Sequence, residues 1–501
     1  MVQDPRSARP GRGGWRAARL TWTAPAGRTR AAGGRRRVPE CGALSKKREP
    51  EVGLDRLNPE MRAFAGESMP WQVRRRRPAA RRSGSTEAAP SPALAAERDG
   101  AEGGSGADGG SGREPSLGPH VLIVGGGAVG GALAHDLSLR GVRVTVVEKG
   151  ELASGSTGRG QGLLHSGARY ATTDRALAVD CAAENKLLRR LAPGSFEEND
   201  GLFVALTDDD AEFGTRFLEA CWQAAVPARR LTRDEALRAE PGLNPDLRFA
   251  VRVPDATMDT MRLPLRFFAT ARSNGADVRP FTEVVGVRVV DGAVTGVRVR
   301  DRAADREYEI GADVVVNAAG SWAGRVAALA GVSLPVTFSW GAMASIRGRP
   351  ANMIVSRLRP SGDAGVVVPE RRSTVIGPLL SPTDQPDPTS VDGEAIDSIR
   401  REAALLVPAL ADGPIRARWT ASSARDAAVG RAGPTDRFVL VDHGTGPKPL
   451  VGFLTLSGGP ATTMRATAQA GADLVCARLG VDRPCGTMDA PLLPHTAWYA
   501  R

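Results

Sequence analysis

The feature that most constrains the fold is a strand–turn–helix–strand unit that begins at His120. The apolar run His120–Val124 ends in Gly125-Gly126-Gly127, and a helical pattern follows through Arg140. A second apolar run, residues 142–147, closes at Glu148. A unit of about 30 residues in this order is typical of a Rossmann-like dinucleotide-binding α/β domain. We therefore expect a parallel sheet covered by helices.

Three glycines in the turn have the spacing of a phosphate-binding fingerprint, Gly125-x-Gly127-x-x-Gly130. Gly125 permits the tight turn, Gly127 lets the backbone approach a pyrophosphate, and Gly130 lets the helix pack closely on the strand. The helix N-terminus then offers free N–H groups and a positive dipole end to phosphates. Glu148, 23 residues after Gly125, is placed to accept hydrogen bonds from ribose hydroxyls.

The fingerprint alone does not separate FAD from NAD. Residues 154–162, Ser-Gly-Ser-Thr-Gly-Arg-Gly-Gln-Gly, form a loop of small residues directly after the Glu148 strand. Small residues let a backbone lie along a bulky planar ligand, which favours a flavin.

The net charge of the chain is concentrated at its N-terminus. The total is +11, of which residues 1–118 carry +10 and the remainder +1. The first 118 residues are rich in Arg, Gly, Ala, Pro and Ser and are predicted to be disordered. Three explanations stay open for them: a translation start assigned too far upstream, a dispensable tail, or a basic arm for a membrane or nucleic acid. Because the rest is almost neutral, we expect no nucleic-acid partner for the folded part.

Other classes of protein are disfavoured by the composition. The five cysteines are scattered without metal-ligand or disulfide-framework spacing, so no metal site is expected. No apolar run is long enough to span a membrane, and the N-terminus does not resemble a secretory signal. A cytoplasmic protein is expected, with at most peripheral contact with the inner face of the cell membrane.

At 501 residues the chain exceeds the size of a single core, so at least two domains are expected. The predicted fold is α/β: a Rossmann-like FAD-binding domain interleaved with an antiparallel-sheet substrate (cap) domain. After the tail, the FAD-binding domain takes residues 119–200, 276–334 and 426–490. The substrate domain takes residues 201–275 and 335–425, and residues 491–501 form a C-terminal tail.

Further elements follow from shorter patterns. Residues 284–290 and 294–300, joined by Asp291-Gly292, predict a hairpin. Residues 335–425 look β-rich with long loops. Strands are expected at Phe438–Asp442 and residues 453–456, and a last helix at residues 463–479.

The chain resembles the FAD-dependent glycerol-3-phosphate dehydrogenases of the D-amino-acid-oxidase-like flavoprotein superfamily, above all the A subunit of the bacterial anaerobic enzyme. The likeness runs from about residue 119 to 490. Its landmarks, in order, are the glycine turn, Thr157-Gly158-Arg159, residues 162–170, Asp200-Gly201-Leu202-Phe203, Val253-Pro254-Asp255, Asn317-Ala318-Ala319-Gly320, residues 439–443, and Gly458-Gly459 with Thr463 and Arg465.

The resemblance implies roles for individual residues. His165 would lie near the isoalloxazine ring and is a candidate catalytic residue. Arg169 and Tyr170 would face the substrate phosphate. Arg425, a candidate for both catalysis and substrate binding, matches an arginine of the family's substrate pocket, and Arg437 is a further candidate for the same phosphate. Arginine suits this task because its planar fork donates two hydrogen bonds to a phosphate.

The resemblance also implies that Gly458 and Gly459 open a last helix whose N-terminus stabilises the negative charge of reduced flavin. The cofactor-binding residues expected from the fingerprint and the resemblance are Gly125, Gly127, Ala128, Gly130, Glu148, Lys149, Ser156, Thr157, Gly162, Leu163, His165, Ala319, Gly320, Gly458, Gly459 and Thr463.

Several positions depart from the family pattern. Pro460 stands where a substrate-binding lysine normally follows the two glycines, and Ser339-Trp340-Gly341 lacks another expected lysine. Gln161 replaces a histidine. Proline is comfortable at a first helical position, so the helix is expected to form while a positive charge is lost.

The function that the resemblance implies is FAD-dependent oxidation of sn-glycerol 3-phosphate to dihydroxyacetone phosphate. Electrons would pass to a quinone or a partner subunit. Two alternatives stay open: a related FAD oxidoreductase acting on a small 2-hydroxy acid or amino acid, and a non-catalytic FAD-binding protein.

Overall fold

The computed structural model describes residues 118–334, 336–360, 365–383, 386, 391–426, 437–445 and 448–500. The side chains of residues 336–338, 383 and 423–426 are not among those described. The predicted N-terminal tail, apart from Gly118, lies outside the described residues.

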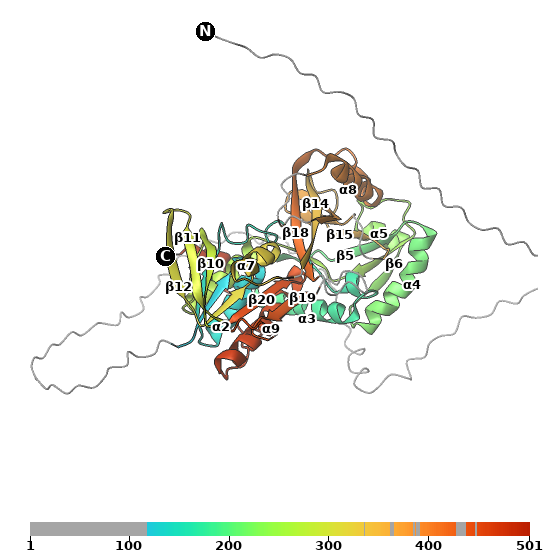
Figure 1. Ribbon diagram of the computed structural model, residues 1–501. Coiled ribbons are helices and arrows are strands. Elements are labelled where there is room, and N and C mark those ends of the chain that lie inside the picture. Colours follow the sequence, from blue (N-terminus) through green and yellow to red (C-terminus); the bar gives the residue numbers. More distant parts are fainter. Residues whose placement is uncertain are drawn as a thin grey trace, which may run out of the picture. The chain divides into compact units, whose positions relative to one another are not determined.

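A six-stranded sheet forms the first layer of the fold (Figure 1). Its strands, in spatial order, are β19 (Phe438–Asp442), β20 (Phe453–Gly458), β13 (Val314–Asn317), β1 (His120–Val124), β2 (Arg143–Val147) and β9 (Asp277–Arg279). All neighbours pair in parallel except β19 and β20. The predicted Rossmann-like α/β fold is confirmed.

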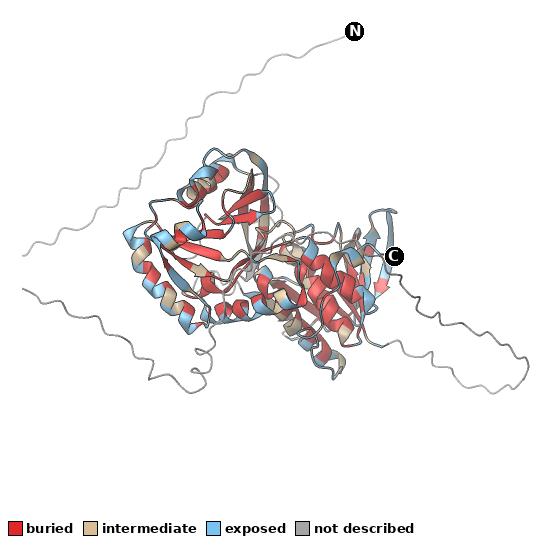
Figure 2. Ribbon diagram, turned by 180° about the vertical axis from the view of Figure 1, so that it is seen from behind, coloured by how far each residue is buried: buried red, intermediate tan, exposed pale blue. Residues whose placement is uncertain are grey.

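Different elements cover the two faces of this sheet. Helix α2 (Ala128–Leu139) packs against both α6 (Arg262–Ser273) and α9 (Met464–Leu479) on one face. The other face is covered by an antiparallel sheet of β10 (Thr282–Val290), β11 (Ala293–Asp301) and β12 (Arg306–Gly311), together with α7 (Ala323–Leu329). Buried residues are concentrated where these layers meet (Figure 2).

The alternation of side chains along the strands explains this layering. In β1, Val121 and Ile123 join the core formed with the helices, whereas Leu122 and Val124 join the core formed with β10–β12. Successive side chains of a strand point to opposite faces, so a strand covered on both sides is apolar throughout. The run His120–Val124 could be recognised as such a strand for that reason.

The predicted hairpin between β10 and β11 is present. Asp291 and Gly292 have φ values of 49° and 75°, as a two-residue turn with positive φ at both positions requires.

A second, eight-stranded sheet is antiparallel apart from the β15–β5 pair. Its strands, in spatial order, are β18 (Ile415–Asp426), β14 (Val336–Arg347), β17 (Ser373–Thr383), β16 (Val367–Glu370), β15 (Ile354–Arg357), β5 (Gly201–Ala205), β7 (Phe249–Val253) and β6 (Arg229–Thr232). The helices outside the first layer are α3 (Arg175–Leu191), α4 (Asp208–Gln223), α5 (Arg233–Ala239) and α8 (Gly393–Leu406). Short 3-10 turns are η2 (Ala168–Tyr170), η3 (Gly320–Trp322), η4 (Pro408–Leu410), η5 (Ala461–Thr463) and η6 (His495–Trp498).

Helix α8 corrects the description of residues 335–425 as β-rich with long loops. Asp392 caps its first turn by accepting a hydrogen bond from the Glu394 backbone N–H at 3.0 Å. Ile396, Ile399 and Ala403 are buried on one face against the eight-stranded sheet. Spacings of three and four residues are a helical signal, but this one is embedded among strands and was missed.

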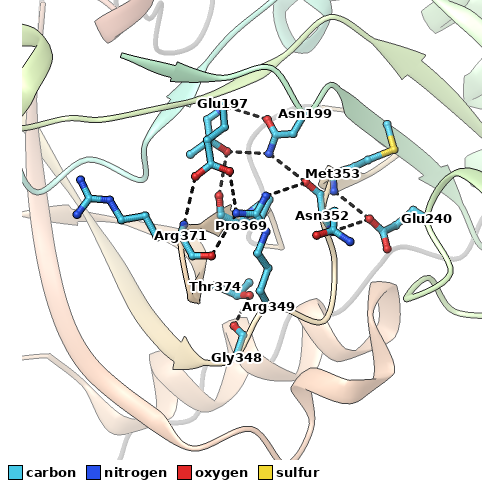
Figure 3. Close-up of polar contacts among 11 residues, drawn as sticks. Glu197, Asn199, Glu240, Gly348, Arg349, Asn352, Met353, Pro369, Arg371 and Thr374 are labelled. Carbon is cyan, nitrogen blue, oxygen red and sulfur yellow. Dashed lines mark hydrogen bonds and ion pairs between the residues drawn. The ribbon is translucent and has the colours of Figure 1, made fainter. Parts of the chain in front are cut away.

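A small third sheet of β3 (Leu163–Leu164), β8 (Ala256–Met258) and β4 (Phe196–Glu197) is tied to the eight-stranded sheet by polar contacts (Figure 3). Arg349 Nη1 donates to Glu197 Oε2 at 2.7 Å and to the carbonyl of Arg371 at 3.2 Å. Thr257 Oγ1 donates to the carbonyl of Pro369 at 2.9 Å. Because β3 leads directly into the loop predicted to contact the flavin, these contacts help to hold that loop in place.

The predicted division into domains stays a prediction. The strands of the eight-stranded sheet come from residues 201–253 and 336–426. Helix α6, which lies in the range predicted for the substrate domain, packs in the core beside α2. No helix of the described residues is long and apolar enough to cross a membrane.

His135 on α2 makes stability depend on pH. Its side chain is fully buried beside Phe267, and neither ring nitrogen has a partner among the described residues. Burial lowers the pKa of His135 to about 4. The folded-state pKa is thus below the unfolded value of 6.5, so stability is full above pH 6.5 and falls as the pH drops toward 4, by about 1.4 kcal/mol per unit.

We therefore expect His135→Leu to be more stable than the parent, by about 1–3 kcal/mol at pH 7.5 and by more at pH 5.5. Urea unfolding at both pH values measures the difference. An equal stability change at the two pH values would contradict the assignment of acid sensitivity to this ring.

Candidate active site

A cavity of about 890 Å³ lies at the carboxyl ends of the parallel strands β1, β2, β13 and β20. Segments that follow these strands line it, together with part of β18. Ligands of open α/β sheets bind outside the carboxyl ends of the strands, so the cavity is where this topology places a cofactor. Its volume is at the upper end of the range for small-molecule sites, about 300–1,000 Å³.

The glycine turn has the geometry that its spacing predicted. Gly125 has a φ of 119°, and a Cβ there would lie 2.5 Å from the carbonyl oxygen of Ala318. A Cβ on Gly130 would lie 2.0 Å from the Gly125 carbonyl oxygen. Gly125, Gly127 and Ala128 line the cavity, whereas Gly130 is a packing residue beneath it. The N-terminus of α2 therefore reaches the cavity wall.

The side chain of Glu148 is held at the end of β2 by two backbone groups. Its Oε2 accepts from the Gly126 N–H at 2.7 Å and its Oε1 from the Gly150 N–H at 2.9 Å. The next residue, Lys149, places its Nζ 3.8 Å from the centre of the Trp322 ring. Glu148, Lys149 and Trp322 all line the cavity.

The loop after β3 brings His165 and Tyr170 to the wall of the cavity. The His165 backbone N–H donates to Thr462 Oγ1 at 2.9 Å, and its ring centre lies 5.4 Å from that of Tyr170. Burial, with a smaller contribution from Arg169, lowers the pKa of His165 to about 3. The imidazole is therefore neutral at ordinary pH. Arg169 is half-buried and is not among the residues that line the cavity.

The two glycines near the end of β20 turn the chain into the last helix. Gly458 and Gly459 have φ values of 80° and 81°, and the 3-10 turn η5 and helix α9 follow Pro460. The helix forms, as predicted, but Pro460 is the extended N-cap residue of η5 and not a first helical residue. Gly458, Gly459 and Pro460 line the cavity; Thr463 is buried behind it, and its Oγ1 donates to the Pro460 carbonyl at 3.1 Å.

The two arginines predicted from the family's substrate pocket differ in what the structure describes. Arg437 lines the cavity and forms a bidentate pair with Asp174, with Nε–Oδ2 and Nη2–Oδ1 distances of 2.7 and 2.5 Å. The pair raises the pKa of Arg437 and lowers that of Asp174. The backbone of Arg425 belongs to β18, but its side chain lies outside the described residues.

Most of the other predicted cofactor-binding residues also line the cavity. Ser156, Thr157, Gly162, Leu163, Ala319 and Gly320 all do so. The hydroxyl of Thr157 accepts a hydrogen bond at 3.0 Å from the Ala128 N–H, at the start of α2. The small-residue loop and the glycine turn therefore form one continuous wall.

Several lining residues were not predicted. Ser321 and Ser422 are two of them: the Ser422 carbonyl on β18 accepts from Ser321 at 3.0 Å and from Ser156, which was predicted, at 2.5 Å. Arg325 and Trp322 also line the cavity. No motif identifies these residues, because strands and loops more than a hundred positions apart bring them together.

The residues present fit FAD. The glycine turn would hold the pyrophosphate against the N-terminus of α2, and Glu148 would accept from ribose hydroxyls. Gln161, which lines the cavity, has a buried Oε1 without a partner among the described residues. A buried acceptor of this kind can accept a hydrogen bond from a bound molecule or an ordered water. Within the described residues no group of His, Cys, Asp or Glu side chains could hold a metal ion.

Residues 120–474 match the family of FAD dependent oxidoreductases. The match covers more than half of the chain, so this protein belongs to that family, and its cofactor is FAD.

The names of similar curated proteins are more specific than the description of the family. The chain is 39% identical over 388 residues to the A1 subunit of the anaerobic glycerol-3-phosphate dehydrogenase of Haloferax volcanii, covering 75% of this chain and 66% of that protein. It is 37% identical over 379 residues to the corresponding protein of Escherichia coli, covering 74% and 69%. The chain thus spans about two thirds of the length of these relatives.

Solved structures agree on the fold. The glycerol-3-phosphate dehydrogenase from Bacillus halodurans, complexed with FAD, superimposes with a TM-score of 0.59 at 22% identity, covering 75% of this chain and 68% of that one. Glycine oxidase from Bacillus cereus gives a TM-score of 0.57 at 23% identity, covering 75% and 98%. The names of these two proteins specify different substrates, so the likeness establishes the fold alone.

Proposed function

We propose that this protein oxidises sn-glycerol 3-phosphate to dihydroxyacetone phosphate and passes the electrons on to a quinone or a partner subunit. The observation that carries the proposal is the 35–39% identity, over about three quarters of the chain, to relatives named for this substrate. The positions that the resemblance assigned to the flavin and the substrate include His165, Tyr170 and Arg437, which line one cavity.

Each of these side chains suits one task. Arg437 offers a cation to the substrate phosphate, and Tyr170 lies beside His165 on the same loop. The neutral ring of His165 can accept a hydrogen bond from the hydroxyl of the carbon that is oxidised. FAD supplies the hydride acceptor. Arg169 and Arg425 remain proposed substrate-binding residues, and Arg425 also a proposed catalytic one.

The low pKa of His165 bears on its role. A general base works best with a pKa near the operating pH, so an imidazole with a pKa of about 3 is better suited to orient the hydroxyl than to remove its proton alone.

We expect His165→Asn to slow flavin reduction by about 10–100-fold while leaving the shape of the pH–rate profile between pH 5.5 and 9 unchanged. The imidazole becomes charged only as the pH falls toward 3, so it contributes no inflection in that window. Stopped-flow flavin reduction across the range measures both. Loss of an acid-side inflection in the variant would show that His165 titrates in the working enzyme.

The proposed substrate is tested by anaerobic flavin reduction with the full chain. FAD content is confirmed by absorbance, sn-glycerol 3-phosphate is added, and bleaching of the long-wavelength flavin band is followed. Rapid bleaching at sub-millimolar substrate supports the proposal. Absence of bleaching in a protein that dithionite reduces would refute it, and bleaching with a small 2-hydroxy acid or amino acid would then identify the second candidate.

Two observations favour that second candidate. Pro460 lines the cavity where the family has a lysine, and the charge of Arg437 is balanced by Asp174. Both reduce the positive charge available to a phosphate dianion. A protein that binds FAD but is reduced by none of these compounds would leave the non-catalytic alternative.

The remaining assignments are part of the same proposal. The FAD-binding domain would comprise residues 119–200, 276–334 and 426–490, with the substrate domain between them. A cytoplasmic protein with at most peripheral membrane contact is consistent with an electron-accepting quinone or protein partner, and the relatives are named as subunits.

A further inference from the structure

The bidentate pair between Arg437 and Asp174 joins two segments 263 residues apart in the chain. Arg437 immediately precedes β19, and Asp174 is the N-cap of α3. The side chain of Asp174 is 20% exposed and that of Arg437 is 45% exposed. Such a pair contributes little to stability by itself, because solvent screens it. Because Arg437 lines the cavity, the pair bears on ligand binding more than on stability.

Asp174 is held in place by hydrogen bonds to neighbouring residues of its own segment. Its Oδ1 accepts from the Leu177 backbone N–H at 3.0 Å as the cap of α3. Its own N–H donates to the carbonyl of Tyr170 at 2.8 Å. Asp174 therefore joins three parts of the site: the turn that carries Tyr170, the start of α3, and the guanidinium of Arg437.

The pair leaves part of the guanidinium for a ligand. Arginine has five N–H donors in a planar fork, and Asp174 takes one from Nε and one from Nη2. No other partner of this guanidinium is found among the described residues. With the Nε edge fixed against the carboxylate, the plane of the guanidinium is set, and Arg437 lines the cavity with three of its N–H donors not used by Asp174.

We propose that Asp174 is a positioning residue that orients Arg437 toward the anionic group of the substrate. The inference rests on the proposed function and names a residue that acts through Arg437 rather than on the substrate itself. A flexible arginine loses side-chain freedom when it binds a phosphate, and a partner that holds it beforehand removes that cost.

A positioning role for Asp174 and a role limited to charge neutralisation predict opposite effects of its removal on anion binding. If Asp174 only cancelled the charge of Arg437, removing the carboxylate would raise the positive potential of the cavity and tighten binding of an anion. A second α3 carboxylate, Asp180, also acts on Arg437 and would stay in place. If Asp174 orients Arg437, its removal weakens anion binding although the cavity becomes more positive.

The test compares the full chain with Asp174→Asn and Asp174→Ser. Asn and Ser both cap helices about as well as Asp, so α3 is retained while the charged partner is lost. Asp392→Asn, a change at the N-cap of α8, is the matched control. FAD content and the Tm of each protein establish that it is folded.

Anaerobic flavin reduction over a range of sn-glycerol 3-phosphate concentrations gives the limiting rate and the half-saturating concentration, and inorganic phosphate serves as a competing anion. We expect both Asp174 variants to raise the half-saturating concentration and the phosphate inhibition constant by about three- to tenfold, with the limiting rate nearly unchanged. Asp392→Asn should match the parent. A merely structural role would lower FAD content or the limiting rate instead.

The outcomes separate this inference from the proposed function. A parent protein that sn-glycerol 3-phosphate does not reduce overturns both. A parent that is reduced, with Asp174 variants that bind the anion equally well or more tightly, overturns the positioning role and leaves the proposed function standing. If only one of the two Asp174 variants folds, its half-saturating concentration and phosphate inhibition constant decide whether Asp174 has the positioning role.

Discussion

Gly130→Ala is expected to produce a protein that holds less than about a tenth of the FAD of the parent and is less stable by about 3 kcal/mol or more. The added Cβ would lie 2.0 Å from the Gly125 carbonyl oxygen. Both groups belong to the backbone elements that define the turn, so no side chain can rotate away. Helix α2 must instead move off β1, and its N-terminus then leaves the cavity wall.

The comparison with other glycines makes this prediction specific. A Cβ on Gly127 would meet only the Thr157 hydroxyl, at 3.0 Å, so Gly127→Ala is expected to cost less stability than Gly130→Ala. Gly393→Ala, in the first turn of α8 with nothing within 4 Å, is the neutral control. Flavin absorbance after purification and thermal unfolding measure the effect. Full FAD content in Gly130→Ala would show that the turn tolerates a displaced helix.

The second large effect is expected at the buried pair of Glu184 on α3 and Arg465 on α9. Their closest approach is 2.6 Å, between Arg465 Nη2 and Glu184 Oε1, and both side chains are nearly inaccessible. Arg465 also donates to Gln469 and Thr487, at 2.8 and 2.9 Å. A cation in the first turn of a helix opposes the helix dipole, so Glu184 compensates an otherwise unfavourable buried charge.

Removing one partner leaves that charge unpaired. We expect Glu184→Met to reduce the free energy of unfolding by about 3–5 kcal/mol, and Arg465→Met by a similar amount. The double variant Glu184→Met/Arg465→Met should lose much less than the sum, since two apolar groups replace two buried charges. Urea unfolding of the four proteins completes the cycle.

An exposed pair provides the control. Arg288 and Glu309 lie 2.9 Å apart on β10 and β12, with side chains about half exposed. Glu309→Gln is expected to cost less than about 1 kcal/mol. Strictly additive effects at Glu184 and Arg465 would mean that the buried charges are stabilised independently of each other.

Much of the cofactor half of the site follows from local sequence. The strand His120–Val124, the glycine turn and Glu148 lie within about 30 residues, and each acts through backbone geometry that residue type alone dictates. The hairpin at Asp291-Gly292 is local in the same way. These elements could be placed correctly before any tertiary contact was known.

Helix α8 shows where local patterns were insufficient. Its buried positions have helical spacing, but the surrounding strands made the whole region look β-rich, and only packing against the eight-stranded sheet distinguishes the two. The pairing of β5 with β15, from residues about 150 positions apart, was equally inaccessible. Such contacts depend on the closure of long loops, which no short pattern encodes.

The long-range side-chain contacts around the cavity were decided by tertiary structure. The sequence by itself determined an FAD-binding α/β fold, because glycine spacing and strand alternation act through the backbone over a few residues. Only the folded chain determined that Ser422 meets Ser156 and Ser321, and that Asp174 holds Arg437. These groups are joined by side-chain contacts across hundreds of residues, and a hydrogen bond of about 3 Å depends on where the whole fold places its two ends.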